Sequence, residues 1–241
     1  MYYKTRHFLY GIFFFLCITI VLLVGIIGYL EWSYVHQERD RNIVESTEWK
    51  QLEENQLFLG KSFVFLAPYV KEESILFPMI NLNSEEVIAI NDDLREAYQT
   101  CVSMKQEGHD VHSNYEYTVQ NNILSILVVT NIDGVNSYET YAFHLDTNKI
   151  ASYQTIYQEA GITDQEMMNR VEIAVQNYYT DVSEGLSFDR EQYVSDTMER
   201  YTQALEQNTL KYYLGKGKKL SLYLEMRTPG TDEIRYQIVS I

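Results

Sequence analysis

The densest group of potential metal ligands is the run His109-Asp110-Val111-His112, which sets two imidazoles and a carboxylate close together. A metal site needs three or four fixed ligands, and the neighbouring sequence supplies nothing to complete this one. Gly108 precedes the run and a predicted strand follows it. We therefore interpret the run as a solvated loop, and no metal site is predicted.

Acidic pairs are frequent in this chain, and such pairs cleave glycosidic bonds when two carboxylates face each other across a cleft. Any acidic surface supplies such pairs, so proximity in the sequence does not indicate catalysis. Neither Asp92-Asp93 nor Asp133-Gly134 shows the alternating oxygen ligands of a calcium loop. We interpret the first pair as helix surface and the second as a turn.

No nucleophile elbow, phosphate-binding loop or dinucleotide fingerprint occurs in the sequence. Cys101 falls on the apolar side of a predicted helix and is interpreted as a small buried hydrophobe. One cluster of lysines favours a solvated hairpin turn, with a contact site for an anionic ligand as the alternative. Its members are Lys211, Lys216, Lys218 and Lys219. The sequence predicts no catalytic residue, no metal ligand and no cofactor.

Hydrophobic periodicity in residues 61–241 predicts an α+β fold, an antiparallel sheet with helices packed on one face. A first strand is expected at 62–70 and an extended segment at 75–82. A helix should follow, capped by Asn83 together with Glu86. Its expected buried face consists of Val87, Ile90, Leu94, Ala97, Cys101 and Val102.

A meander of about four antiparallel strands is expected after this helix, because alternating and strongly apolar runs are separated by turn residues. The runs are 114–120, 123–132, 137–146 and 150–153, with tight turns at Asn121-Asn122 and Asp133-Gly134.

Two helices should follow the meander. Thr163 and Glu166 form a capping box for the first, whose expected stripe is Met167, Val171, Ala174, Val175 and Tyr178. The second should run from Asp189 to about Gln207. Strands are expected at 210–214, 220–226 and 235–241.

An uncharged run extends from Phe8 to Leu30. As a helix it would span roughly 34 Å, enough for a bilayer core of about 30 Å. It exceeds the apolar core of a signal peptide and lacks a cleavage site, so we interpret it as an anchor in contact with membrane lipid. Lys4 and Arg6 precede it and favour a cytoplasmic amino terminus. The sequence thus predicts a single-pass membrane protein with residues 1–7 inside, a span at 8–30, a helical stalk at 31–60 and an extracellular domain at 61–241.

The formal net charge of −15 and the sequence pI of about 4.7 exclude nucleic acid as a plausible partner, because phosphate binding requires lysine and arginine. Cationic partners would be attracted, although an acidic surface also serves to keep an exported domain soluble. Cys17 and Cys101 are the two cysteines, and the predicted topology keeps them apart, so no disulfide is expected.

Three stretches carry a resemblance to a known family. These are "ILFPMINL" followed by "IAINDDLREAY", "YTVQNNILSILVVTNIDGVNSYETYAFHLDTNKI", and the closing "LKYYLGKGKKLSLYLEMRTPGTDEIRYQIVSI". Together they resemble the domain of unknown function that forms the ectodomain of the anti-sigma-V factor, a membrane-anchored lysozyme sensor. The same type of domain accompanies a cell-wall polysaccharide deacetylase. The resemblance covers roughly Phe63 to Ile241 and implies an envelope-facing binding role.

The chain departs from that family in three respects. Gly134-Val135-Asn136-Ser137 stands where the family commonly carries Gly-Gly-Ala-His. A cytoplasmic tail of seven residues, as predicted above, would be too short to hold a sigma factor, and no deacetylase domain is recognised in the sequence. Sigma-factor binding and deacetylation are therefore not expected of this chain.

These observations lead to one expected function and two alternatives. The expected function is a membrane-anchored extracellular module, not an enzyme, that binds or senses an envelope component or a cationic protein. The first alternative is a carboxylate-dependent hydrolase that modifies the cell wall. The second is a structural accessory subunit of a membrane complex.

Overall fold

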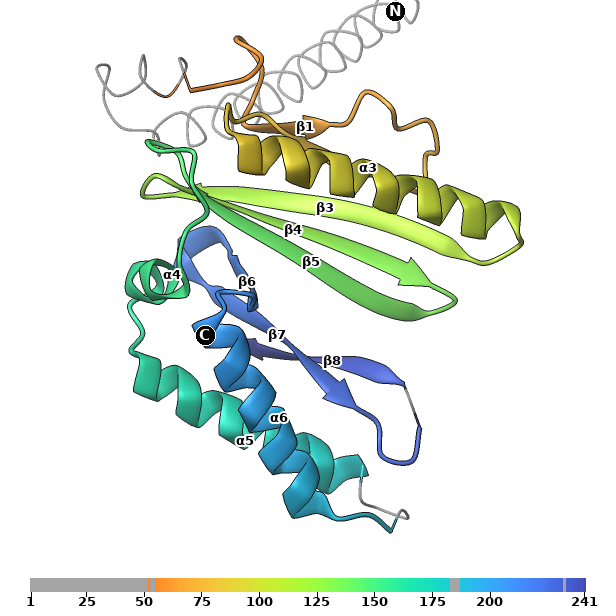
Figure 1. Cartoon of the computed structure of the whole chain (residues 1–241), viewed down its shortest axis with the longest axis vertical. Coiled ribbons are helices and arrows are strands. Elements are labelled where there is room, and N and C mark those ends of the chain that lie inside the picture. Colours follow the sequence, from red (N-terminus) through yellow and green to blue (C-terminus); the bar gives the residue numbers. More distant parts are fainter. Residues whose placement is uncertain (1–51, 53–54, 183–186, 232) are drawn as a thin grey trace, which may run out of the picture. The chain divides into compact units, whose positions relative to one another are not determined.

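The structure is a computed structural model that describes residues 52, 55–182, 187–231 and 233–241 (Figure 1). The chain divides into two compact units, Met1–Val44 and Glu45–Ile241, and the described residues belong to the second. The predicted inner tail, the run from Phe8 to Leu30 and most of the predicted stalk lie outside the described residues. Within the described part, no helix has both the length and the apolarity needed to cross a bilayer.

The carboxyl-terminal end of the predicted stalk packs with the folded unit. Leu52 and Gln56 are buried. The Asn55 carbonyl accepts hydrogen bonds from the Asn83 backbone N–H, at 2.8 Å, and from Asn148 Nδ2, at 2.9 Å. These contacts make Leu52 and residues 55–60 part of the folded unit, whereas the predicted domain begins at residue 61.

The first elements are a short hairpin and a long helix. Strand β1 (Val64–Leu66) pairs antiparallel with β2 (Pro78–Ile80), and helix α3 (Glu85–Gln106) follows. The predicted cap is wrong by one residue, because the backbone of Ser84 is extended and its hydroxyl accepts from the Val87 N–H at 3.3 Å.

The buried face of α3 also differs from the prediction. Asn91 and Tyr98 are buried there, whereas Ala97 is exposed. The Asn91 amide accepts from the Ile80 N–H at 2.8 Å and donates to the Ile80 carbonyl at 2.9 Å. Hydrophobic periodicity cannot predict a buried polar side chain that forms hydrogen bonds with the backbone of a strand.

A regular three-stranded meander comes next, formed by β3 (Val111–Gln120), β4 (Ile123–Ile132) and β5 (Val135–His144). Both predicted turns are confirmed: their central residues have positive φ, at Asn121, Asn122, Asp133 and Gly134. The predicted fourth strand is wrong, because Ile150 forms only an isolated bridge with Phe143.

Three helices follow: α4 (Tyr153–Ala160), α5 (Asp164–Val182) and α6 (Arg190–Glu206). Helix α4 was not predicted; Ser152 caps it with a hydroxyl that accepts from the Thr155 N–H. The capping box of α5 is confirmed, since the Thr163 N–H donates to Glu166 Oε2 at 3.1 Å and the Glu166 N–H donates to Thr163 Oγ1 at 3.2 Å.

The second meander consists of β6 (Lys211–Leu214), a 3-10 turn η1 (Lys216–Lys218), β7 (Leu220–Arg227) and β8 (Ile234–Ser240). Helices α5 and α6 cover one face of it, and α3 covers one face of the first meander (Figure 1). The core beneath α5 and α6 includes Met167, Val171, Val175, Tyr179, Leu220, Leu222, Leu224 and Met226.

The two meanders meet through the backbone of Leu214. Its N–H donates to Ser125 Oγ at 3.0 Å, and its carbonyl accepts from Thr118 Oγ1. Both hydroxyl groups come from the first meander. The α+β class and the antiparallel pairing are confirmed, but the strands are divided among three sheets rather than one.

Candidate functional site

Lys211 forms the centre of a charged network between the two meanders. Its side chain is 22 % exposed, and its Nζ lies 3.0 Å from Glu139 Oε1 and 3.2 Å from Glu225 Oε1. The ammonium also donates to the Tyr236 hydroxyl at 3.0 Å, and that hydroxyl donates to Glu225 Oε1 at 3.0 Å. Side chains from three other strands, β5, β7 and β8, thus converge on one ammonium of β6.

The protonation of Lys211 follows from these contacts. Burial lowers the pKa of Lys211, but the hydrogen bonds to Tyr236 and Glu139 and the charge of Glu139 outweigh it, so the pKa lies above its ordinary value. The ammonium therefore stays protonated at neutral pH. A protonated lysine cannot act as a nucleophile or a general base, so the network is a fixed ion cluster.

Stacked tyrosines extend this network between the two meanders. The Tyr138 ring lies 4.5 Å from the Tyr223 ring, nearly parallel to it, and 5.2 Å from the Tyr236 ring, which it meets edge-on. Leu127, Tyr213 and Tyr223 form a small buried cluster beside them. Burial raises the pKa of Tyr223 to about 12, so its hydroxyl is neutral at physiological pH.

The lysine cluster of the sequence is not a single surface. Lys211 lies on β6 in the network described above, whereas Lys216 and Lys218 lie in the 3-10 turn. Lys218 Nζ is 3.8 Å from Glu159 Oε2, in an ion pair with α4. The expected hairpin turn is present, but Lys211 is not part of it.

The residues of the histidine run are hydrogen bonded to carboxylates. His109 Nδ1 lies 2.6 Å from Asp133 Oδ2, and His112 Nε2 lies 3.0 Å from Asp110 Oδ1. The hydrogen bond from His109 and the one from the Asp110 N–H lower the pKa of Asp133. These contacts tie the start of β3 to the turn between β4 and β5.

Cys101 is confirmed as a buried residue of α3. Burial raises the pKa of its thiol, which disfavours the reactive thiolate.

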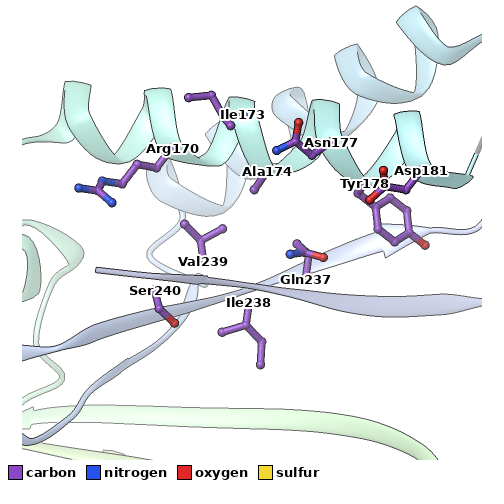
Figure 2. A pocket seen from close by; sticks show the side chains of 10 residues that line it. All are labelled: Arg170, Ile173, Ala174, Asn177, Tyr178, Asp181, Gln237, Ile238, Val239 and Ser240. Atoms are coloured by element: carbon purple, nitrogen blue, oxygen red, sulfur yellow. The ribbon is translucent and has the colours of Figure 1, made fainter.

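A groove of about 460 Å³ lies between α5 and β8 (Figure 2). Ile173, Ala174 and Tyr178 line it from the helix, and Gln237 and Val239 point toward the helix from the strand. A smaller hollow of about 260 Å³ lies between α6 and β6–β7, beside Lys211. Neither hollow could be predicted from the sequence, because each depends on how a helix packs on a distant strand.

Carboxylates dominate the exposed sides of α5 and α6. None of those named here forms an ion pair with a lysine or arginine in the described part of the chain. They are Asp164, Glu166 and Glu172 on α5, and Glu191, Asp196 and Glu199 on α6. We call this set the acidic helix face.

Two arrangements of side chains bear on metal binding and on hydrolysis. Outside the masked positions, no group of three or more histidine, cysteine or acidic side chains could hold a metal ion. Glu139 and Glu225 converge on one point, but the Lys211 ammonium occupies it. Exposed carboxylates and a partly apolar groove remain available to partners.

No protein-family model, curated protein or solved structure matches this chain. The resemblance to the ectodomain of the anti-sigma-V factor therefore stays a prediction.

Proposed function

We propose that this chain is a single-pass, membrane-anchored module whose extracellular domain binds a cationic protein or an envelope component through the acidic helix face. The helix from Phe8 to Leu30 would remain in the lipid, with the amino terminus in the cytoplasm. The formal net charge of −15 supports binding to a cationic partner. The run from Phe8 to Leu30, which contains no charged residue, supports the membrane anchor.

The acidic helix face is the observation that carries the proposal. Each carboxylate on it is exposed and forms no ion pair with a lysine or arginine among the described residues, so its charge is available to a partner. A surface of one sign raises the rate of encounter with oppositely charged proteins, and salt weakens the effect. Two neighbouring helices offer a broader surface than α3 alone.

The first described residues support a position close to the membrane. Leu57, Phe58 and Leu59 are exposed, and Leu59 is 73 % exposed. A run of exposed apolar side chains is costly in water and favourable at a lipid interface. The run lies where the proposed stalk would join the domain.

The hydrolase alternative lacks this kind of support in the described residues. Glycoside cleavage requires two facing carboxylates with space for the sugar or a water molecule between them. The space between Glu139 and Glu225 holds the Lys211 ammonium and the Tyr236 hydroxyl. The accessory-subunit alternative predicts a crosslink to another membrane protein in whole cells, whereas the binding module does not require one.

Binding should be measured with the full chain in lipid nanodiscs, using a cationic lysozyme-type protein and soluble wall fragments as probes. A triple variant, Glu191→Lys with Asp196→Lys and Glu199→Lys, reverses the charge of α6. A matched control, Glu85→Lys with Glu86→Lys and Asp93→Lys, reverses the same number of charges on α3.

We expect saturable binding of one probe that weakens with added salt and falls by at least about tenfold in the α6 variant. The control should keep most of the affinity. Equal losses in both variants would refute a localised acidic site, and no saturable binding of either probe would refute the function.

The topology is tested separately, with reporter fusions at both ends of the chain in whole cells. We expect a cytoplasmic amino terminus and an external carboxyl terminus. A cytoplasmic carboxyl terminus would contradict the proposal.

A further inference from the structure

The outer edge of β8 carries backbone groups that are not paired with another strand. The Ile241 N–H donates to the Leu220 carbonyl of β7. Every second residue of β8 counted back from Ile241 therefore directs its backbone N–H and carbonyl toward β7. The alternate residues, Tyr236 and Ile238 among them, therefore direct their N–H and carbonyl groups away from the sheet. Among the described residues, no strand pairs with the outer edge of β8.

Each of the other edges of the two meanders carries at least one contact. The edge of β6 bonds to Ser125 and Thr118 at Leu214. Phe143 on β5 bridges to Ile150, and Ser113 on β3 bridges to Ile75. An open edge is a template for another strand, and native folds normally cover such edges.

Helix α5 forms a wall beside this open edge, and the groove of about 460 Å³ lies between them (Figure 2). Ile173 is 58 % exposed on the helix, and Ile238 is 43 % exposed on the strand. The Tyr178 hydroxyl, which belongs to the same groove, is buried and has no hydrogen-bond partner among the described residues. Apolar surface and an unused hydroxyl suit the side chains and backbone of an added strand.

Opposite charges stand at the two ends of the groove. Arg170 lies at the end near Ser240, and Asp181 lies at the other end, beyond Gln237 (Figure 2). Neither forms an ion pair in the described part of the chain. The two are roughly 16 Å apart along the helix, close to the roughly 14 Å that four residues of an extended strand cover.

We propose that β8 accepts an extended peptide segment of a partner protein as an additional antiparallel strand under α5. Figure 2 shows β8 running opposite to α5, so an antiparallel segment would begin at Arg170 and end at Asp181. Charge complementarity then selects a segment with an acidic residue followed four positions later by a basic one. Between them on the same face, a small apolar side chain would contact Ile173 and Ala174. This recognition differs from the acidic helix face and does not depend on it.

Two synthetic peptides of equal composition test the proposal against the full chain in nanodiscs. The first, Thr-Glu-Thr-Val-Thr-Lys-Thr, has the selected charge order, and the second, Thr-Lys-Thr-Val-Thr-Glu-Thr, reverses it. We expect the first to bind at least about tenfold more tightly. Binding should also slow the hydrogen exchange of the Tyr236 and Ile238 amides, which a side-chain contact alone would not do.

A charge-swapped variant, Arg170→Glu with Asp181→Lys, should reverse the preference between the two peptides. Both side chains are exposed, so folding should be unchanged, as circular dichroism can verify. The control Asp93→Lys with Arg95→Glu makes an equivalent swap on α3 and should leave the preference as it was.

Equal binding of the two peptides, an unchanged preference in the swapped variant, or protection of other amides would each overturn the proposal. Because the peptides carry no net charge, their failure to bind would leave binding of a cationic protein to α6 unaffected. Loss of that protein's binding would likewise leave the peptide result standing.

Discussion

The folded unit contains the same succession twice, a long helix followed by a three-stranded meander. In α3–β3–β4–β5 the strands have ten residues each and two-residue turns. In α6–β6–β7–β8 the strands have four, eight and seven residues, and a 3-10 turn and a longer loop connect them. The order of helix and strands is therefore the same in both halves, but the strand lengths and turns differ, and so do the surfaces.

The difference lies in what borders the edge strands. In the first half, β3 and β5 each carry one isolated bridge, at Ser113 and at Phe143. In the second half, hydroxyl groups of the first half cover β6, but β8 faces the groove and solvent. Under the proposed function, the first half would serve as a support, and the second half, with the added helix α5, would offer the surfaces for binding.

The largest expected effects come from the two cores. Leu124→Ala in β4 and Leu222→Ala in β7 each remove a fully buried side chain and should lower the free energy of unfolding by about 2–5 kcal/mol. Because Leu214 joins the halves, both variants should shift one common transition in calorimetry. Leu59→Ala, at an exposed position, is the control. Two separate transitions, each shifted by one variant, would show that the halves fold independently.

The second largest effect is expected at the hydrogen-bonded contact between the two halves. Ser125→Ala leaves the Leu214 N–H without its acceptor and should cost about 1–3 kcal/mol in urea unfolding. Ser137→Ala, at an exposed serine of β5, should change the free energy of unfolding by less than about 0.5 kcal/mol. Similar small changes in both variants would mean that the hydroxyl contact does not hold the halves together.

Alkaline pH should destabilise the second half through two buried tyrosines. Burial raises the pKa of Tyr223 and of Tyr212 to about 12 from the ordinary value of 10.0. A raised folded-state pKa gives stability that is complete below pH 10 and is lost as the pH rises toward 12. Tyr223→Phe should recover about 1–2 kcal/mol of that alkaline loss. Stability that does not change above pH 10 would contradict the burial of these hydroxyls.

The smallest effect is expected at the turn between β4 and β5. The pKa of Asp133 is lowered by the hydrogen bonds from His109 and the Asp110 N–H. The contribution of the Asp133 carboxylate to stability is present at pH values above its ordinary pKa of 3.8. It is lost as the pH falls through the lowered pKa of the folded state. Asp133→Asn should flatten the acid limb of the stability profile slightly, whereas Asp146→Asn should not. Identical acid limbs in both variants would refute the contact.

Local chemistry made several elements predictable. The boundaries of β4 follow from its apolar run, and Asp133-Gly134 suits the positive φ values of its turn. The capping box at Thr163 is also local and was predicted correctly. Such features depend on neighbours within a few residues, which the sequence displays directly.

The parts that depend on distant contacts were missed. Lys211 belongs to a network because β5, β7 and β8 bring acceptors to it, and no spacing in the sequence indicates this. Helix α4 was not predicted, and the residues 150–153 just before it, "IASY", were interpreted as a strand because they are apolar and few. The groove beside β8 arises from the packing of α5 and could not be read from either segment alone.

The most direct test of the division between support and binding surface is a hydrogen-exchange footprint. The full chain in nanodiscs is compared with and without a saturating cationic lysozyme-type protein. The account predicts slower exchange in α5 and α6 and no change in α3 or β3. Protection confined to α3 and the first meander would contradict it.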